Sequence, residues 1–295
     1  MSKQFLDDSQ AWQSPERPSF RKDAELIDQT SISYLAFYQI LFIYFSKIKL
    51  LKISCSEMEN NKVIIIGATS GIGKELARIY HKKGFVVGVT GRRIELLEKL
   101  KADLRTNISY VEMDVTKNSA IGNLETLIEK IGGMDLIIIN SGTGFINPKL
   151  DFEKEKVTVS TNVNGFLAIA LFAFNYFNKK SRGHIVGISS VAALRGGPAP
   201  AYNASKAFIS NYLEGLRFLA SKRKSEIYIT DIKPGFVDTA MVNSKKVFWM
   251  ATPAKAANQI YKAILKRKKH AYITKRWWLA AQLYKILPDF IYFKE

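Results

Sequence analysis

Tyr202 and Lys206 are four residues apart, a spacing that places both side chains on one face of a helix. A protonated lysine beside a tyrosine favours the phenolate, so we expect the pKa of Tyr202 to fall. A tyrosine tuned in this way can exchange a proton with an alcohol or carbonyl oxygen near neutral pH. Ser190, upstream at the end of an apolar run, could hold that same oxygen. These residue types therefore indicate proton transfer at an oxygen atom.

The same tyrosine–lysine spacing occurs a second time, at Tyr176 and Lys180. No serine precedes this pair at a matching distance, and the chain is rich in lysine. We therefore interpret the second pair as a chance repeat of the spacing.

Composition limits the class of protein. A chain of 295 residues allows one large or two small domains, and its single cysteine, Cys55, excludes an intrachain disulfide and suits a reducing compartment. Three scattered histidines and no Cys/His cluster argue against a metal site. The net charge of +18 suits nucleic acid, anionic lipid or a solvated surface. Because no interleaved aromatic and basic motif occurs, we predict no nucleic-acid partner and a cytoplasmic protein.

Residues 1–57 differ from the rest of the chain. Residues 1–30 are polar, contain two prolines and show no sustained period, which predicts disorder. Residues 32–45 are apolar but shorter than the roughly 20 residues that span a bilayer. Three interpretations remain open: a membrane anchor, a helix packed on the domain, or sequence upstream of a true start at Met58. We favour the third.

A glycine turn follows the first apolar run. Gly67, Gly71 and Gly73 lie between a β-branched segment and a segment with helical spacing. In that context, amide groups at the start of the helix can bind a diphosphate. A P-loop is excluded because Ala68 stands where its first glycine belongs and Glu75 replaces its Ser/Thr. The pattern favours a dinucleotide.

The next apolar run, residues 85–90, ends before Arg92 and Arg93. An NAD site requires a carboxylate about 20 residues after the glycines, whereas arginine suits the 2′-phosphate of NADP(H). Arginine is also electrostatically disfavoured at a helix N-terminus, which favours a cofactor role for this pair. We therefore predict NADP(H) as the cofactor.

Apolar strands alternate with helices six or seven times along the chain, which predicts an α/β fold: a Rossmann-like, doubly wound parallel sheet in one domain. Ligands then bind at the carboxyl ends of the strands. Further strands are expected at residues 108–113, 135–139 and 226–232 and before Ser190, and helices at 118–131, at 151–178 and around Tyr202.

With these motifs in place, residues 62–274 resemble the short-chain dehydrogenase/reductase family. Gly67, Gly71 and Gly73 match its glycine turn, Asp114 its adenine contact, and Pro234-Gly235 its nicotinamide-side turn. Asn162, Ser190, Tyr202 and Lys206 look like its catalytic tetrad. One departure is Ile139, which replaces the first asparagine of the family's Asn-Asn-Ala-Gly segment and affects a structural position.

The resemblance implies a hydride-transferring oxidoreductase that works as a homo-oligomer, a dimer or tetramer. Tyr202 would donate a proton, Ser190 would orient the substrate oxygen, Lys206 would bind the nicotinamide ribose, and Asn162 would hold a water. The cofactor-binding set that it implies is Gly67, Thr69, Ser70, Gly71, Ile72, Gly73, Arg92, Arg93, Asp114, Val115, Asn140, Gly142, Tyr202, Lys206, Pro234, Gly235, Val237 and Thr239.

Two other classes of protein are candidates. A serine hydrolase requires a Gly-x-Ser-x-Gly elbow, which residues 187–191 do not provide. A regulator that senses NADP(H) and has lost catalysis remains the alternative, although the intact Ser190, Tyr202 and Lys206 argue against it.

The last part of the chain bears on the substrate. Apolar residues follow Pro234-Gly235 in the segment that commonly forms a lid in this fold, which suggests a hydrophobic carbonyl or alcohol substrate; packing of that segment on the core is the other interpretation. They are Phe236, Met241, Val242, Val247, Phe248, Trp249 and Met250. We place the domain at residues 58–274 and an amphipathic tail helix at 275–295. Its paired Trp277 and Trp278 suit a peripheral membrane contact, a dimer contact or packing on the domain.

Overall fold

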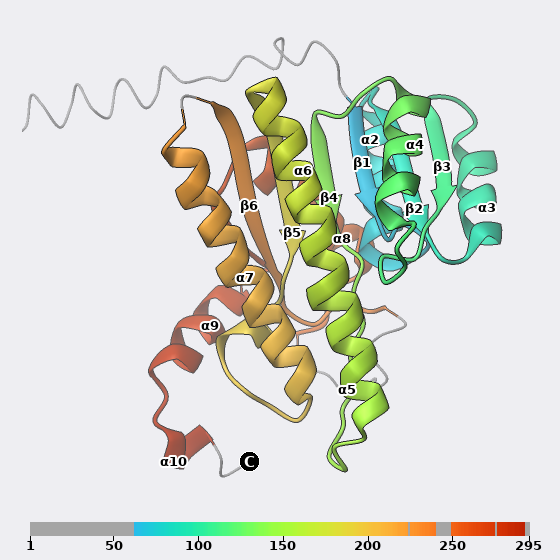
Figure 1. Cartoon of the computed structure of the whole chain (residues 1–295). Helices are drawn as coiled ribbons and strands as arrows, with labels where there is room; N and C mark the ends of the chain where they lie inside the picture. Colours follow the sequence, from blue (N-terminus) through green and yellow to red (C-terminus); the bar gives the residue numbers. More distant parts are fainter. Residues whose placement is uncertain (1–61, 224, 240–248, 275, 293–295) are drawn as a thin grey trace, which may run out of the picture. The chain divides into compact units, whose positions relative to one another are not determined.

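Seven strands form one parallel sheet in the order β3-β2-β1-β4-β5-β6-β7 (Figure 1). The structure, a computed structural model, describes residues 62–223, 225–239, 249–274 and 276–292; the predictions for residues 1–57 and for 240–248 of the lid lie outside them. The strands are β1 (Lys62–Ile66), β2 (Val86–Gly91), β3 (Ile108–Glu112), β4 (Leu136–Ile139), β5 (Arg182–Ile188), β6 (Glu226–Pro234) and β7 (His270–Ile273).

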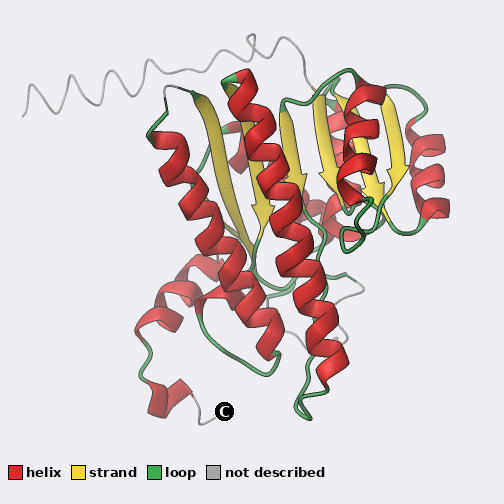
Figure 2. Ribbon diagram, in the orientation of Figure 1, coloured by secondary structure: helices red, strands yellow, loops and turns green. Residues whose placement is uncertain are grey.

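Helices cover both faces of this sheet (Figure 2). One face packs against α2, α3 and α8, and the other against α4, α6 and α7. The helices are α2 (Gly71–Lys82), α3 (Ile94–Leu104), α4 (Ala120–Ile131), α5 (Phe152–Val159), α6 (Phe166–Lys180), α7 (Pro200–Ser221), α8 (Pro253–Leu265), α9 (Arg276–Ile286) and α10 (Asp289–Tyr292). This three-layer arrangement confirms the predicted Rossmann-like fold.

Burial on both faces explains why the strands read as unbroken apolar runs. Val63 and Ile65 of β1 face the α2/α3/α8 layer, whereas Ile64 and Ile66 face the α4/α6/α7 layer. All four side chains are 0% exposed. A strand covered on one side would alternate apolar and polar residues instead.

The long helix expected at residues 151–178 is interrupted. Between α5 and α6 the backbone widens into a π-type turn over Ser160–Gly165, which contains Asn162. Such turns often occur at functional sites, and no sequence pattern announces them. Residues Phe152–Lys180 together are long and apolar enough to cross a bilayer, but half of the apolar window is buried in the fold, the environment of a core helix.

Helix α9 lies within the segment assigned to the tail. Trp277 and Ala281 are buried, whereas Trp278, Leu279 and Leu283 are exposed. Apolar side chains therefore occupy both the packed and the solvent-facing sides of α9. The burial of Trp277 and Ala281 agrees with the interpretation that this helix packs on the domain.

Candidate active site

Helix α7 carries Tyr202 and Lys206 past the carboxyl end of β5, and Ser190 is the second residue after that strand. Tyr202 and Ser190 share a side-chain hydrogen bond. The Nζ atom of Lys206 lies 5.6 Å from the centroid of the Tyr202 ring. The structure thus brings together three residues that the sequence assigns to proton transfer.

Lys206 is held deep in the protein. Its side chain is buried, and Nζ donates to the carbonyl oxygen of Ile188 over 2.9 Å. Burial lowers the pKa of Lys206 to about 8, and the carboxylate of Asp231 opposes that fall. The ammonium therefore links α7 to the last residue of β5 and loses its proton at a lower pH than a surface lysine.

The pKa of Tyr202 corrects the sequence-based expectation. Burial of the phenol group raises this pKa above its usual value, and the hydrogen bond with Ser190 only partly offsets the rise. The ammonium of Lys206 makes its hydrogen bond to Ile188. In this structure Tyr202 is therefore a protonated phenol, the form that can donate a proton.

Contacts with two chain segments, one after β5 and one at the end of β6, orient the hydroxyl of Ser190. Its Oγ accepts from the amide of Ala192 over 3.1 Å and lies 3.4 Å from the carbonyl oxygen of Pro234. The second contact reaches the end of β6, where the predicted Pro234-Gly235 turn begins. The hydroxyl of Ser190 thus sits between the ends of two strands.

Asn162, in the π-type turn, fixes the loop after β4. Its Oδ1 accepts from the amide of Thr143 over 2.8 Å, and its Nδ2 donates to the carbonyl of Thr143 over 2.7 Å. Nδ2 also lies 2.9 Å from Oγ of Ser205, which donates to the carbonyl of Tyr202. Asn162 therefore connects this loop to the helix that carries the tyrosine.

Gly144 is a site residue that sequence reasoning missed. A Cβ atom at this position would lie 2.3 Å from Cδ2 of Tyr202, so only glycine lets the loop lie on the ring. The signal available in the sequence was a second glycine in the loop, two residues after Gly142. A Cβ on Gly142 itself would lie 3.2 Å from Nζ of Lys206.

The glycine turn packs against the end of β4. Asn140 donates from Nδ2 to the carbonyl of Gly67 over 2.7 Å, and a Cβ on Gly73 would lie 2.2 Å from that same oxygen. Helix α2 begins here, after Ser70, without a side-chain cap and without an acidic residue in its first turn. Its free amides and positive dipole end suit the diphosphate of a dinucleotide.

The two predicted arginines take different positions. Arg93 donates to Oγ1 of Thr69 over 2.6 Å and to Oγ of Ser70 over 2.9 Å, so it lies across the glycine turn. Arg92 lies near Asp114. Partial burial by itself would raise the pKa of Asp114. Hydrogen bonds from Thr116 and the charge of Arg92 outweigh this effect, so the pKa of Asp114 lies below its usual value. The predicted adenine contact is thus ionised.

The remaining predicted cofactor residues gather at the same edge. A Cβ on Gly71 would touch Thr239 at 3.0 Å, so the segment after β6 reaches the glycine turn. Val115 and Val237 are buried, and the partly buried Ile72 packs against the core. Within the described residues, no group of His, Cys, Asp and Glu side chains could hold a metal ion.

The second tyrosine–lysine pair lies elsewhere. Lys180 donates to the carbonyl of Met134 over 3.0 Å, and the hydroxyl of Tyr176 accepts from the amide of the same residue over 3.2 Å. Met134 precedes β4, so the pair sits at the amino end of the sheet, opposite the site. The pair therefore lies away from Ser190, Tyr202 and Lys206, as the interpretation of a chance repeat predicts.

Known proteins resemble this chain closely enough to place it. A family model described as short chain dehydrogenase matches residues 61–247. An uncharacterized oxidoreductase of Myxococcus xanthus is 34% identical over 79% of this chain and 95% of its own. A solved short-chain dehydrogenase from Sphingobium yanoikuyae in complex with NADPH (21% identity, TM-score 0.66) covers 75% of this chain and 92% of its own. A solved serine dehydrogenase complexed with NADP+ (24%, 0.65) covers 72% and 94%.

Asn162→Ala tests the role of this asparagine in the loop. The variant loses three hydrogen bonds at a side chain that is 0% exposed. Leaving buried partners unsatisfied should lower the free energy of unfolding by about 1–3 kcal/mol, measured by urea denaturation. Asn258→Ala on α8 is the control, because Asn258 is exposed and makes one bond, to the carbonyl of Ala254. Equal losses in the two variants would contradict this role.

Proposed function

Because the chain belongs to the short-chain dehydrogenase/reductase family of oxidoreductases, we propose that it interconverts a carbonyl and a secondary alcohol with NADP(H). The single observation that carries this proposal is the hydrogen bond between Tyr202 and Ser190 next to the buried Lys206. A phenol, a hydroxyl and an ammonium at one strand end can position and protonate a substrate oxygen. A serine hydrolase would also need a Gly-x-Ser-x-Gly elbow, which residues 187–191 do not provide.

The proposed proton chemistry follows from the positions of these groups. Ser190 donates a hydrogen bond to the carbonyl oxygen of the substrate and fixes its distance from Tyr202. The raised pKa of the Tyr202 phenol keeps its proton available until charge develops on that oxygen. Lys206, one helical turn away, stabilises the phenolate that remains. Asn162 holds the loop that closes over the Tyr202 ring.

The residues that would hold the cofactor surround the glycine turn. The free amides at the start of α2 suit its diphosphate, Asp114 its adenine, and Arg92 and Arg93 a 2′-phosphate. When bound, the reduced cofactor supplies a hydride. The protein provides orientation and the proton.

A hydrophobic substrate is proposed from the surroundings of Tyr202. Phe145 and Ile146 follow Gly144, which contacts the tyrosine ring, and are 39% and 74% exposed. Phe236, next to the Pro234-Gly235 turn, is 43% exposed.

Exposed apolar residues also lie on α9 and α10, where a second copy in a homo-oligomer or a membrane surface could cover them. Size-exclusion chromatography measures the oligomeric state, and the same experiment with lipid vesicles detects membrane binding. We propose that the protein is cytoplasmic.

Arg92→Asp tests the choice of cofactor. If this arginine contacts the 2′-phosphate, the unmodified protein binds NADPH more tightly than NADH by about tenfold to hundredfold, because a charge-assisted hydrogen bond contributes roughly 1.5–3 kcal/mol. The variant should lose most of this preference, measured by nicotinamide fluorescence titration. Arg182→Asp, at the opposite end of the sheet, is the control and should keep it. Equal affinities in the unmodified protein would overturn the assignment.

Tyr202→Phe tests the proton donor. The variant removes one hydroxyl and keeps the ring, so folding and NADPH binding should survive while turnover falls by about 10²–10⁴-fold. Turnover is followed by NADPH absorbance on apolar ketones of increasing length, whose kcat/KM should rise with chain length. Tyr176→Phe, from the pair at the other end of the sheet, should keep its turnover. A Tyr202→Phe protein that retains most of its activity would show that the proton comes from another group.

A further inference from the structure

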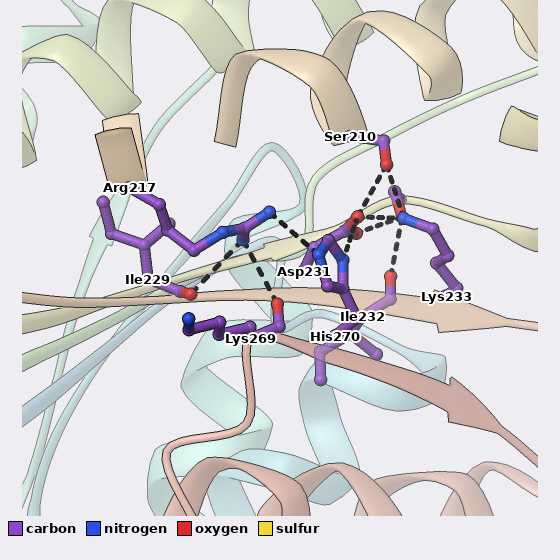
Figure 3. A network of polar contacts seen from close by, with 9 residues as sticks. Ser210, Arg217, Ile229, Asp231, Ile232, Lys233, Lys269 and His270 are labelled. Carbon is purple, nitrogen blue, oxygen red and sulfur yellow. Dashed lines mark hydrogen bonds and ion pairs between the residues drawn. The ribbon is translucent and has the colours of Figure 1, made fainter. Parts of the chain in front are cut away.

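A buried carboxylate that the site description does not use lies in the middle of β6. Asp231 is 0% exposed and contacts side chains from α7, from β7, from its own strand β6 and from the residue after β5 (Figure 3). Oγ of Ser210 donates to it over 2.6 Å, and Nδ1 of His270 lies 3.5 Å away. Ser189 and Lys233 complete its set of partners.

The contacts of Asp231 lead directly to the catalytic residues. Ser189 precedes Ser190, and Ile188, one residue further back, accepts the hydrogen bond of Lys206. Ser210 lies one helical turn after Lys206 on α7. Asp231 therefore contacts both segments between which the ammonium of Lys206 is held.

The charges around this carboxylate are unequal. Two buried ammonium groups, Lys206 and Lys233, lie near Asp231, the one buried carboxylate among the residues that the structure describes. The other groups facing Asp231 come from α7 and β7. Arg217 donates to Nε2 of His270 over 3.1 Å, which leaves Nδ1 of His270 to donate to Asp231. Tyr272 of β7 also lies within its electrostatic reach.

We propose that Asp231 is a positioning residue that keeps Lys206 protonated and in place beside Tyr202, through its negative charge and its hydrogen bonds to Ser189 and Ser210. The catalytic consequence rests on the proposed function. The electrostatic part does not, because it concerns the free protein. Lys233 is the competing partner, since it contacts Asp231 directly.

The direction of the effect follows from the charges. Burial lowers the pKa of Lys206 to about 8, and the carboxylate of Asp231 raises it against that fall. Burial would raise the pKa of Asp231, but hydrogen bonds from His270, Lys233 and Ser189 and the charge of Lys233 hold it well below its usual range. Asp231 is thus ionised at neutral pH, and removing its charge must lower the pKa of Lys206.

The test measures that pKa in the free protein. With ¹³Cε-labelled lysine, the resonance of Lys206 is identified by its loss in Lys206→Met, and its shift is followed against pH. The unmodified protein should give a midpoint near pH 8. Asp231→Asn should lower this midpoint by about 1 unit or more, the size of a close charge–charge effect. An unchanged midpoint would overturn the proposal.

Two further variants separate Lys206 from Lys233. In Lys233→Met the carboxylate remains, so the midpoint should not fall. The double variant Asp231→Asn/Lys233→Met is compared with Lys233→Met, because both lack the second ammonium, and its midpoint should be the lower of the two. If these two variants have the same midpoint, Asp231 only neutralises Lys233 and the proposal is wrong. The double variant also serves if Asp231→Asn alone does not fold; failure of both to fold would assign Asp231 to stability and overturn the proposal.

Activity provides the second measurement. The high-pH limb of kcat/KM should move to lower pH in Asp231→Asn, in parallel with the midpoint of Lys206. A protein that shows the NMR shift but reduces no carbonyl would contradict the proposed function while supporting the role of Asp231. A shifted midpoint with an unmoved limb would contradict its catalytic consequence.

Discussion

The hydrogen bond from the ammonium of Lys206 to the carbonyl of Ile188 joins helix α7 to the end of β5. A buried ammonium is costly unless its protons find acceptors, so this contact fixes where α7 can lie. Tyr202 then stands one turn away, within reach of Ser190 just beyond the strand. The geometry of the proposed chemistry thus depends on one buried charge.

A parallel sheet brings the other parts of the site to the same edge. The glycine turn follows β1, Asn140 follows β4, Ser190 follows β5, and the Pro234-Gly235 turn ends β6. Because every strand runs in the same direction, these ends meet regardless of their separation in sequence. Asn140 and Asn162 then tie the loops to the glycine turn and to α7.

Local patterns in the sequence predict much of this arrangement. The apolar run of β1 and the glycines after it are local signals, and the fold and the position of Tyr202, Lys206 and Ser190 follow from them. What depends on distant packing could not be predicted. The pKa of Tyr202 is raised because protein surrounds the phenol, and the close approach of Gly144 shows how tightly the loop covers it. The spacing between Tyr202 and Lys206 does not indicate whether the phenol of the tyrosine is buried.

The contacts of Asp231 also could not be predicted from local patterns in the sequence. In the sequence Asp231 is one acidic residue in an apolar strand, and its partners come from the residue after β5, from α7 and from β7, far apart along the chain. The π-type turn that carries Asn162 is likewise set by packing between α5, α6 and α7 rather than by a residue pattern.

The central claim is that this site reduces a carbonyl. Its most direct test is to incubate the protein with NADPH that carries deuterium at both C4 positions of the nicotinamide and with an apolar ketone, and to analyse the product by mass spectrometry and NMR. We expect one deuterium on the carbinol carbon of a single alcohol enantiomer. Tight NADPH binding without deuterium transfer to any carbonyl would contradict it and would identify the chain as a cofactor-sensing protein instead.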